Sequence, residues 1–149
     1  MSVKQESTAQ QQALVCHGLI ILFLGLLSGI GFSVAAATGP NDTPLYASWR
    51  FAHMEGLVNG IAVIAIAAAW PAIYRVGKMV SVGRWALILG CYANIIGPII
   101  NALFVQKRLI APETGLEAFI VYGFYIPGCL PMFAVPLFIV AALANRRES

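Results

Sequence analysis

The sequence from residue 49 to residue 74 reads WRFAHMEGLVNGIAVIAIAAAWPAIY, and this stretch decides the fold. It is long and apolar enough to cross a membrane as a helix, which takes about 20 residues. Its first half nevertheless contains three polar side chains, those of His53, Glu55 and Asn59. A polar or ionisable group in hydrocarbon is costly, so such residues usually face a protein interior, a cavity or a cofactor. This segment is therefore where the function is expected.

The rest of the chain repeats the pattern of long uncharged stretches. The 149 residues are 60% hydrophobic and only 10% charged, whereas a soluble domain carries about 25% charged residues. No charged residue lies between positions 6 and 42, 55 and 75, 84 and 107, or 117 and 146. The sequence predicts an all-α integral membrane protein, a single four-helix transmembrane bundle of residues 13–145 behind a frayed polar tail of residues 1–12. The spans are expected at about 13–37, 51–74, 84–106 and 117–144.

The basic residues at the ends of the spans predict the orientation. Cytoplasmic loops carry an excess of lysine and arginine, and the side that holds both termini has six of these residues against three on the other. Both termini are therefore expected in the cytoplasm, with His53 entering the membrane from the outer face. The net charge of +3 is no sign of nucleic-acid binding, because the basic residues lie at membrane edges. The three scattered cysteines show no zinc-binding spacing.

The second span has two chemically different faces. At about 100° per residue, His53, Gly56 and Gly60 share one face of a helix. Two glycines beside a histidine would leave space for a large, flat group. Glu55 and Asn59 are four residues apart and form a second face, turned well away from the first.

For His53 two interpretations stay open. It is either a polar residue near a helix end, bonded to a carbonyl or water, or a metal or haem ligand. His17 is expected near the opposite membrane face, so the stacked histidine pairs of an electron-carrying cytochrome are absent. A single axial histidine leaves a coordination position open, which favours chemistry over electron transfer.

The other polar residues of the spans also have two interpretations each. Glu55 either pairs with Arg50 near the interface, or acts as a general acid or base, a ligand-orienting acceptor or a proton-coupling carboxylate. Asn59 and Asn94 either hydrogen-bond between helices or contact a substrate, with Asn59 preferred. Three tyrosines are candidate donors, or belong to an aromatic belt or the core: Tyr92, Tyr122 and Tyr125. Three basic residues on the side of His53 either pair with haem propionates or are ordinary loop charges: Arg50, Lys107 and Arg108.

The fourth span contains Pro127, Pro131 and Pro136. Three prolines in one span predict kinks, which are tolerated only where neighbours satisfy the carbonyl groups that lose their helical partner. In the first span, Gly25 and Gly29 place small residues four apart, which favours close contact between helices.

Several of these motifs resemble known families. The run CHGLI from residue 16, the glycines from 25 to 31, and Trp49-x-x-Ala52-His53 followed by Asn59-Gly60 resemble the bacterial styrene oxide isomerases. The run HMEGLVNG from residue 53, with Tyr92-Ala93-Asn94, is similar to the hydroxylaminobenzene mutases. The resemblance implies a small four-helix protein of the bacterial inner membrane, a homotrimer that binds haem b through one axial histidine. It also implies the rearrangement of an aryl epoxide to an aldehyde, without net redox change, in aromatic compound degradation.

The resemblance places His53 as the iron ligand and Asn59 as the substrate-contacting amide. The candidate site is completed by Glu55, Asn94 and Tyr92 as catalytic residues and by Gly56, Gly60 and Arg50 beside the cofactor. Two positions depart from the isomerase pattern. Pro98 stands where a tyrosine is expected, and the position of Glu55 is acidic only in the mutases. Both departures argue against the epoxide as substrate.

The predicted function is a haem-dependent membrane isomerase in which ferric iron acts as a Lewis acid on an epoxide, or on a hydroxylamine, in a dry apolar pocket. Because the two faces of the second span are opposed, Asn59 and Glu55 are expected to reach the haem of a neighbouring chain. The expected partners are thus a small apolar aromatic substrate, membrane lipid and further copies of the chain. Two alternatives stay open, a small proton-coupled exporter that uses Glu55 and a non-catalytic membrane subunit or haem-binding anchor.

Overall fold

A computed structural model describes residues 3–74, 78–107 and 111–148. Within these ranges the chain has no strand and forms four helical segments long and apolar enough to cross a membrane, which confirms the predicted all-α membrane fold. The elements are α1 (Val3–Thr38), α2 (Pro44–Ile73), α3 (Lys78–Phe104), α4 (Gly115–Ile120), the π-helix η1 (Val121–Tyr125), the 3-10 helix η2 (Pro127–Cys129) and α5 (Pro131–Glu148).

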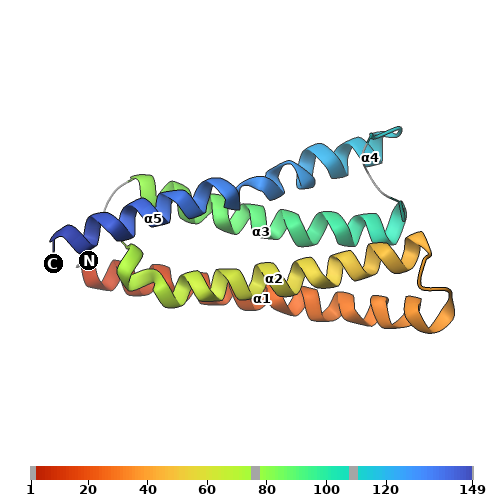
Figure 1. Cartoon of the computed structure of the whole chain (residues 1–149), viewed down its shortest axis with the longest axis horizontal. Helices are drawn as coiled ribbons and strands as arrows, with labels where there is room; N and C mark the ends of the chain where they lie inside the picture. Colours follow the sequence, from red (N-terminus) through yellow and green to blue (C-terminus); the bar gives the residue numbers. More distant parts are fainter. Residues whose placement is uncertain (1–2, 75–77, 108–110, 149) are drawn as a thin grey trace.

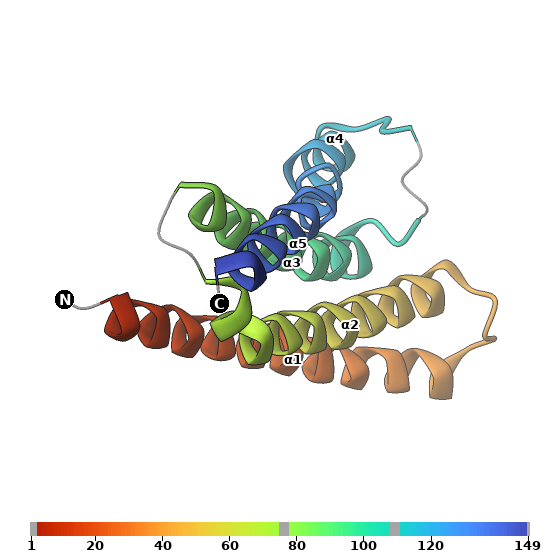
Figure 2. The same cartoon turned by 60° about the vertical axis from the view of Figure 1, so that its left-hand side comes forward.

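The four segments form two antiparallel pairs. In Figure 1, α1 lies along α2, and α3 lies along the segment that runs from α4 to α5. Both termini are at the same end of the molecule, as four crossings require. Figure 2 shows that the segment from α5 to α4 diverges from α2 toward the end where α4 lies. The assignment of the end with the termini to the cytoplasm stays a prediction from the basic residues.

The first helix begins ten residues earlier than predicted. Residues 3–12 were expected to fray, but they continue α1 as a regular helix. Glutamine, glutamate, lysine and alanine are good helix formers. Gln10 also hydrogen-bonds Glu6 one turn away at 3.1 Å, and Gln11 Nε2 donates to the carbonyl of Ala67 on α2 at 2.9 Å. The polar tail therefore docks on the second helix instead of fraying.

Glycines bring α1 and α2 into backbone contact. A Cβ added at Gly56 would overlap the backbone of Gly25, and one added at Gly60 would lie 2.6 Å from the backbone nitrogen of Leu22. The predicted close contact through small residues is confirmed. The space predicted beside Gly56 and Gly60 is not present, because the backbone of α1 fills it. The expectation that this glycine face receives a cofactor within one chain is corrected accordingly.

The second helix also begins earlier than predicted, at Pro44 instead of residue 51. Thr43 caps its start by accepting a hydrogen bond from the Tyr46 backbone N–H at 3.2 Å, and a proline is favoured in the first helical turn. His53 therefore lies about two and a half turns inside α2. It is not a residue at a helix end.

The fourth span is interrupted, as its prolines predict. Pro127 opens η2, Pro131 opens α5, and Pro136 lies inside α5. Before this break, the helix widens into η1, where the Ile126 N–H reaches back to the carbonyl of Val121 at 2.9 Å. The span therefore changes its hydrogen-bonding pattern three times between Ile120 and Pro131, from α to π, to 3-10 and back to α. Proline has no N–H to continue an α-helical ladder.

Candidate active site

His53 points from α2 toward α1. Its Nδ1 lies 2.8 Å from the carbonyl oxygen of Gly25, and the ring of Phe32 is stacked on the imidazole with ring centres 6.0 Å apart. A carbonyl can only accept, so the neutral imidazole carries its proton on Nδ1 and keeps a lone pair on Nε2. Metal-binding histidines are commonly fixed in this way. The arrangement suits a histidine that binds iron through Nε2.

Glu55 and Asn59 form the predicted pair on the other face of α2. Asn59 is only 8% exposed, and its Nδ2 donates both to Glu55 Oε2 and to the Glu55 carbonyl at 2.8 Å. Asn94 on α3 donates from its Nδ2 to Asn59 Oδ1 at 3.4 Å and to the carbonyl of Gly128 at 3.0 Å. Three predicted site residues are thus brought together, and Asn94 ties them to the break in the fourth span.

The bonding of this cluster assigns different roles to the carboxylate and the amide. Both N–H bonds of the Asn59 side chain have acceptors, so its amide has no donor left for a ligand. The half-buried carboxylate of Glu55 uses Oε2 for Asn59, while Oε1 has no hydrogen-bonding partner in the part of the chain that the structure describes. Within the same residues, Glu55 makes no ion pair with Arg50, so the interfacial pairing expected as one alternative is not observed.

The two halves of the candidate site face opposite sides of α2. His53 contacts α1, whereas Asn59 contacts α3 through Asn94. The predicted opposition of the two faces is therefore confirmed. The two side chains are therefore directed at different neighbouring helices.

Tyr92 and His17 form a separate polar pair in the bundle. The Tyr92 hydroxyl lies 3.1 Å from His17 Nδ1, and the two rings meet edge to face. Because Tyr92 lies near the middle of α3, His17 is deeper in the bundle than the predicted position near the membrane face. The structure thus places Tyr92 beside His17 and does not bring it to Asn94 or Glu55.

The remaining predicted tyrosines have different surroundings. Tyr122 is 63% exposed on the outside of the bundle. Tyr125 lies opposite Phe51 of α2, with the rings edge to face and 6.4 Å between their centres. Tyr125, Phe51 and the exposed Arg50 all line a cleft of about 920 Å³ between α2 and the α3–η1 region. Of these two tyrosines, Tyr125 lines the cleft and Tyr122 does not.

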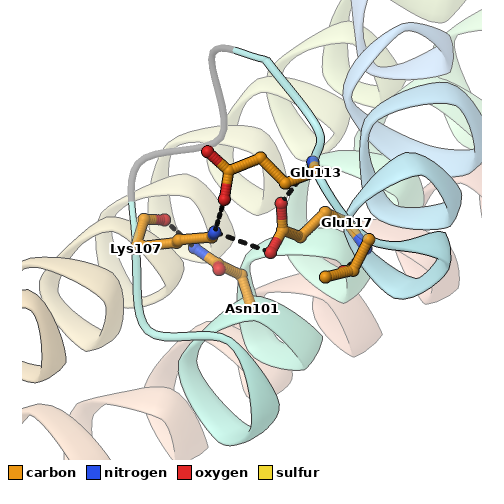
Figure 3. A network of polar contacts seen from close by, with 5 residues as sticks. Asn101, Lys107, Glu113 and Glu117 are labelled. Carbon is orange, nitrogen blue, oxygen red and sulfur yellow. Dashed lines mark hydrogen bonds and ion pairs between the residues drawn. The ribbon is translucent and has the colours of Figure 1, made fainter.

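Lys107 belongs to a polar network at the same end of the molecule (Figure 3). Its ammonium group lies 2.7 Å from Glu117 and 3.2 Å from Glu113. Glu117 is only 3% exposed, and its second oxygen accepts the Glu113 backbone N–H at 2.7 Å. The charge of Lys107 is thus already balanced by two carboxylates. Lys107 is therefore not available for the predicted pairing with a haem propionate. Arg108 lies outside the described residues.

Sequence reasoning missed Asn101 and Glu117. Asn101 is buried, lines the cleft, and donates to the carbonyl of Lys107 at 3.1 Å. The available signal was the amide itself, a polar group inside an apolar span. For Glu117, the signal was its position three residues after Thr114, whose hydroxyl accepts the Glu117 N–H at 3.2 Å and caps α4.

A model of the family described as "Styrene oxide isomerase" matches residues 10–143. The chain belongs to the styrene oxide isomerase family. It is also similar to the hydroxylaminobenzene mutase HabA of Ectopseudomonas oleovorans, with 27% identity over 141 residues, which cover 89% of this chain and 98% of the relative. Both predicted resemblances are confirmed. The chain is therefore an isomerase of this membrane family, and the exporter and non-catalytic alternatives are set aside.

Proposed function

We propose that this isomerase rearranges an arylhydroxylamine within the membrane, with haem b held by His53 and with Glu55 as the proton-transferring group. The observation that carries the proposal is the half-buried Glu55 carboxylate, held by Asn59 at 2.8 Å, with its other oxygen unbonded by any donor in residues 3–74, 78–107 and 111–148. The similarity to a hydroxylaminobenzene mutase over nearly the whole chain supports the same substrate class.

His53 fits the requirement for an axial ligand. The hydrogen bond from Nδ1 to Gly25 and the stacking of Phe32 fix the ring before any ligand arrives. When bound, ferric haem would supply a Lewis acid for the oxygen of the substrate. The chain itself fixes the tautomer and orientation of His53, which is the usual contribution of the residues behind a metal ligand.

Glu55 supplies the proton movement that the rearrangement needs. When a hydroxyl group moves from nitrogen to a ring carbon, that carbon loses one proton and the nitrogen gains one, so no redox partner is required. A single carboxylate can accept the first proton and return the second. Asn59 would hold Glu55 in position for this transfer, because both of its N–H bonds are directed at Glu55.

The opposed faces of α2 favour an active site shared between copies of the chain. His53 is on the α1 side and Glu55 is on the α3 side, so the iron ligand of one chain would meet the carboxylate of its neighbour. The packing of α1 against α2 supports the same arrangement. The backbone of α1 occupies the space beside Gly56 and Gly60, so a cofactor would not fit between these two helices. The homotrimer implied by the family resemblance would provide such neighbours.

An aryl epoxide is the second candidate substrate. The description of the family model favours it. Against it stands Pro98, a fully buried residue of α3 at the position where the isomerases are expected to have a tyrosine.

The proposal is tested with purified ferric protein, hydroxylaminobenzene and styrene oxide, without an electron donor. Hydroxylaminobenzene should be converted, and Glu55→Gln should lower kcat roughly 10- to 100-fold, as expected for the loss of one interaction with a charged group. The Soret band should stay unchanged. Glu6→Gln is the matched control, because Glu6 likewise accepts a hydrogen bond from an amide one turn later, that of Gln10, and it should keep full activity. Conversion of styrene oxide alone would select the second candidate, and activity that appears only with an electron donor would refute the isomerisation.

A further inference from the structure

The cleft between α2 and the α3–η1 region has the size of a small-molecule site. Its volume is about 920 Å³, and sites for small ligands range over about 300–1,000 Å³. It lies toward the end of the molecule that holds the α1–α2 connection, where the segment from α5 to α4 diverges from α2 (Figure 2). Apolar and aromatic side chains cover much of its lining, among them Phe51, Met54 and Tyr125.

One buried acceptor in the lining of this cleft has no partner. Asn101 is 5% exposed, and its Oδ1 is fully buried, with no hydrogen-bond donor among the residues that the structure describes. The side chain of Tyr125 also interacts with Asn101, but no donor of the described residues reaches Oδ1 with the geometry of a hydrogen bond. A buried acceptor left unpaired is destabilising, and such a group commonly marks a place where a ligand or a water molecule completes the bonding.

A hydrogen bond fixes which way the Asn101 amide faces. Its Nδ2 is directed at the carbonyl of Lys107, which can only accept, so a flipped amide would set two oxygens against each other. Lys107 is in turn held by Glu117 and Glu113 (Figure 3). The cleft therefore offers a fixed acceptor that distinguishes ligands with an O–H or N–H group from ligands without one.

The cleft also lies close to the Glu55 cluster along the chain. Phe51 is one helical turn before Glu55 on α2, and Met54 is its immediate neighbour. Phe51 and Tyr125, which form an edge-to-face pair, both belong to the lining of the cleft. An aromatic ring has the shape and surface to pack against these two rings.

We propose that this cleft binds an aromatic ring with a hydroxyl or amino group, which donates a hydrogen bond to Asn101 Oδ1. Its role as an outer site for the substrate or product of the Glu55 cluster rests on the proposed function. The binding itself does not, because it depends only on the lining of the cleft.

The test compares phenol with anisole, which has the same ring and oxygen but no O–H group. Binding of each probe to the full-length protein in lipid nanodiscs is measured by isothermal titration, with empty nanodiscs as the reference. Phenol should bind about tenfold more tightly than anisole, as expected from one hydrogen bond to a buried acceptor. Asn101→Leu should remove this preference and keep the binding of anisole. Asn41→Leu, which removes an exposed amide from the same cleft, should preserve the preference.

A second variant keeps the inference testable if Asn101→Leu does not fold. Ala47 is exposed and lines the cleft, so Ala47→Trp should fill the cleft and weaken the binding of both probes at least tenfold. Equal binding of phenol and anisole to the unmodified protein, or a preference that survives in Asn101→Leu, would overturn the inference. Neither probe is a substrate for rearrangement. A phenol preference without conversion of hydroxylaminobenzene would therefore refute the proposed function alone, and conversion without the preference would refute the cleft alone.

Discussion

The two helix pairs are held together by different means. In the α1–α2 pair, two unbroken helices touch through glycines, and Gly56 meets Gly25 backbone to backbone. In the other pair, α3 lies along a segment broken by prolines, and a side chain, that of Asn94, bonds the carbonyl of Gly128 in the break. Close backbone packing needs no polar groups, whereas an interrupted helix exposes carbonyls that require donors. Polar residues of the candidate site therefore gather where α2 meets the broken half.

The largest effect should come from a methyl group in the regular half. Gly56→Ala would place a Cβ against the backbone of Gly25, which cannot move aside as a side chain could. We expect a loss of about 1–3 kcal/mol or more in the free energy of unfolding, measured by denaturation in detergent. Gly123→Ala in η1 is the control. Only a side chain at 3.6 Å faces that position, so its stability should be unchanged or slightly raised. Equal losses in both variants would contradict the proposed difference between the halves.

The next effect concerns cofactor binding. His53→Ala should abolish the Soret band of the purified protein, because it removes the proposed Nε2 ligand. His17→Ala should retain most of it, since His17 Nδ1 is engaged with Tyr92 in the core of the bundle. Both histidines contact a neighbouring helix, so either substitution removes a packing contact. The comparison of the two variants therefore separates the loss of an iron ligand from the loss of helix packing. Haem content that is equal in His53→Ala and in the unmodified protein would refute the ligand assignment.

A smaller effect should follow from cutting the link between the halves. Asn94→Ala leaves the Gly128 carbonyl and Asn59 Oδ1 without a donor, which should cost roughly 0.6–1.7 kcal/mol of stability and also lower turnover. Asn145→Ala is the matched control, because Asn145 likewise donates to two carbonyls, those of Ala72 and Tyr74, at the opposite end. It should lose similar stability and keep its turnover. Unchanged turnover in Asn94→Ala would show that the link to Asn59 is structural only.

The smallest effect is expected at the outer network. Hydrogen bonds to two carboxylates raise the pKa of Lys107 above its ordinary value of 10.5, and the bond to Glu117 contributes more than the bond to Glu113. Because the pKa is raised in the folded state, the ion pairs stabilise the fold from the pH at which both carboxyl groups are ionised up to about 10.5, and this contribution disappears as the pH rises through the raised pKa. Lys107→Met should therefore lower Tm slightly at pH 7, with a smaller difference at pH 11. A difference that grows with pH would contradict the assignment.

The features that follow from spacing along one helix were predictable from the sequence. Charge-free stretches gave the four spans, and the 100° step between residues separated His53 from Glu55 and Asn59 correctly. The prolines of the fourth span predicted its break. These inferences need only the geometry of a single helix, and that geometry does not depend on neighbours.

Features that depend on which helix lies opposite were not predictable in this way. Gly56 and Gly60 appeared to offer space, yet the same absence of a side chain allows α1 to fill it. His17 and Tyr92 are 75 positions apart in the sequence, and nothing in either span indicates that they meet. The extended start of α1 was missed for the same reason, since the bond from Gln11 to Ala67 exists only once α2 is in place.

The π-helix gives the fourth span an unusual register. In η1, the hydrogen bond from Ile126 to Val121 spans five residues in place of four, so the chain advances one residue further before the next bond closes. Removing a single residue from Val121–Tyr125 would restore an ordinary turn and rotate everything before it by about 100° relative to α5. Glu117 would then turn away from Lys107, while α5 stayed in place. The one extra residue in η1 thus sets the direction in which the side chains of α4 face.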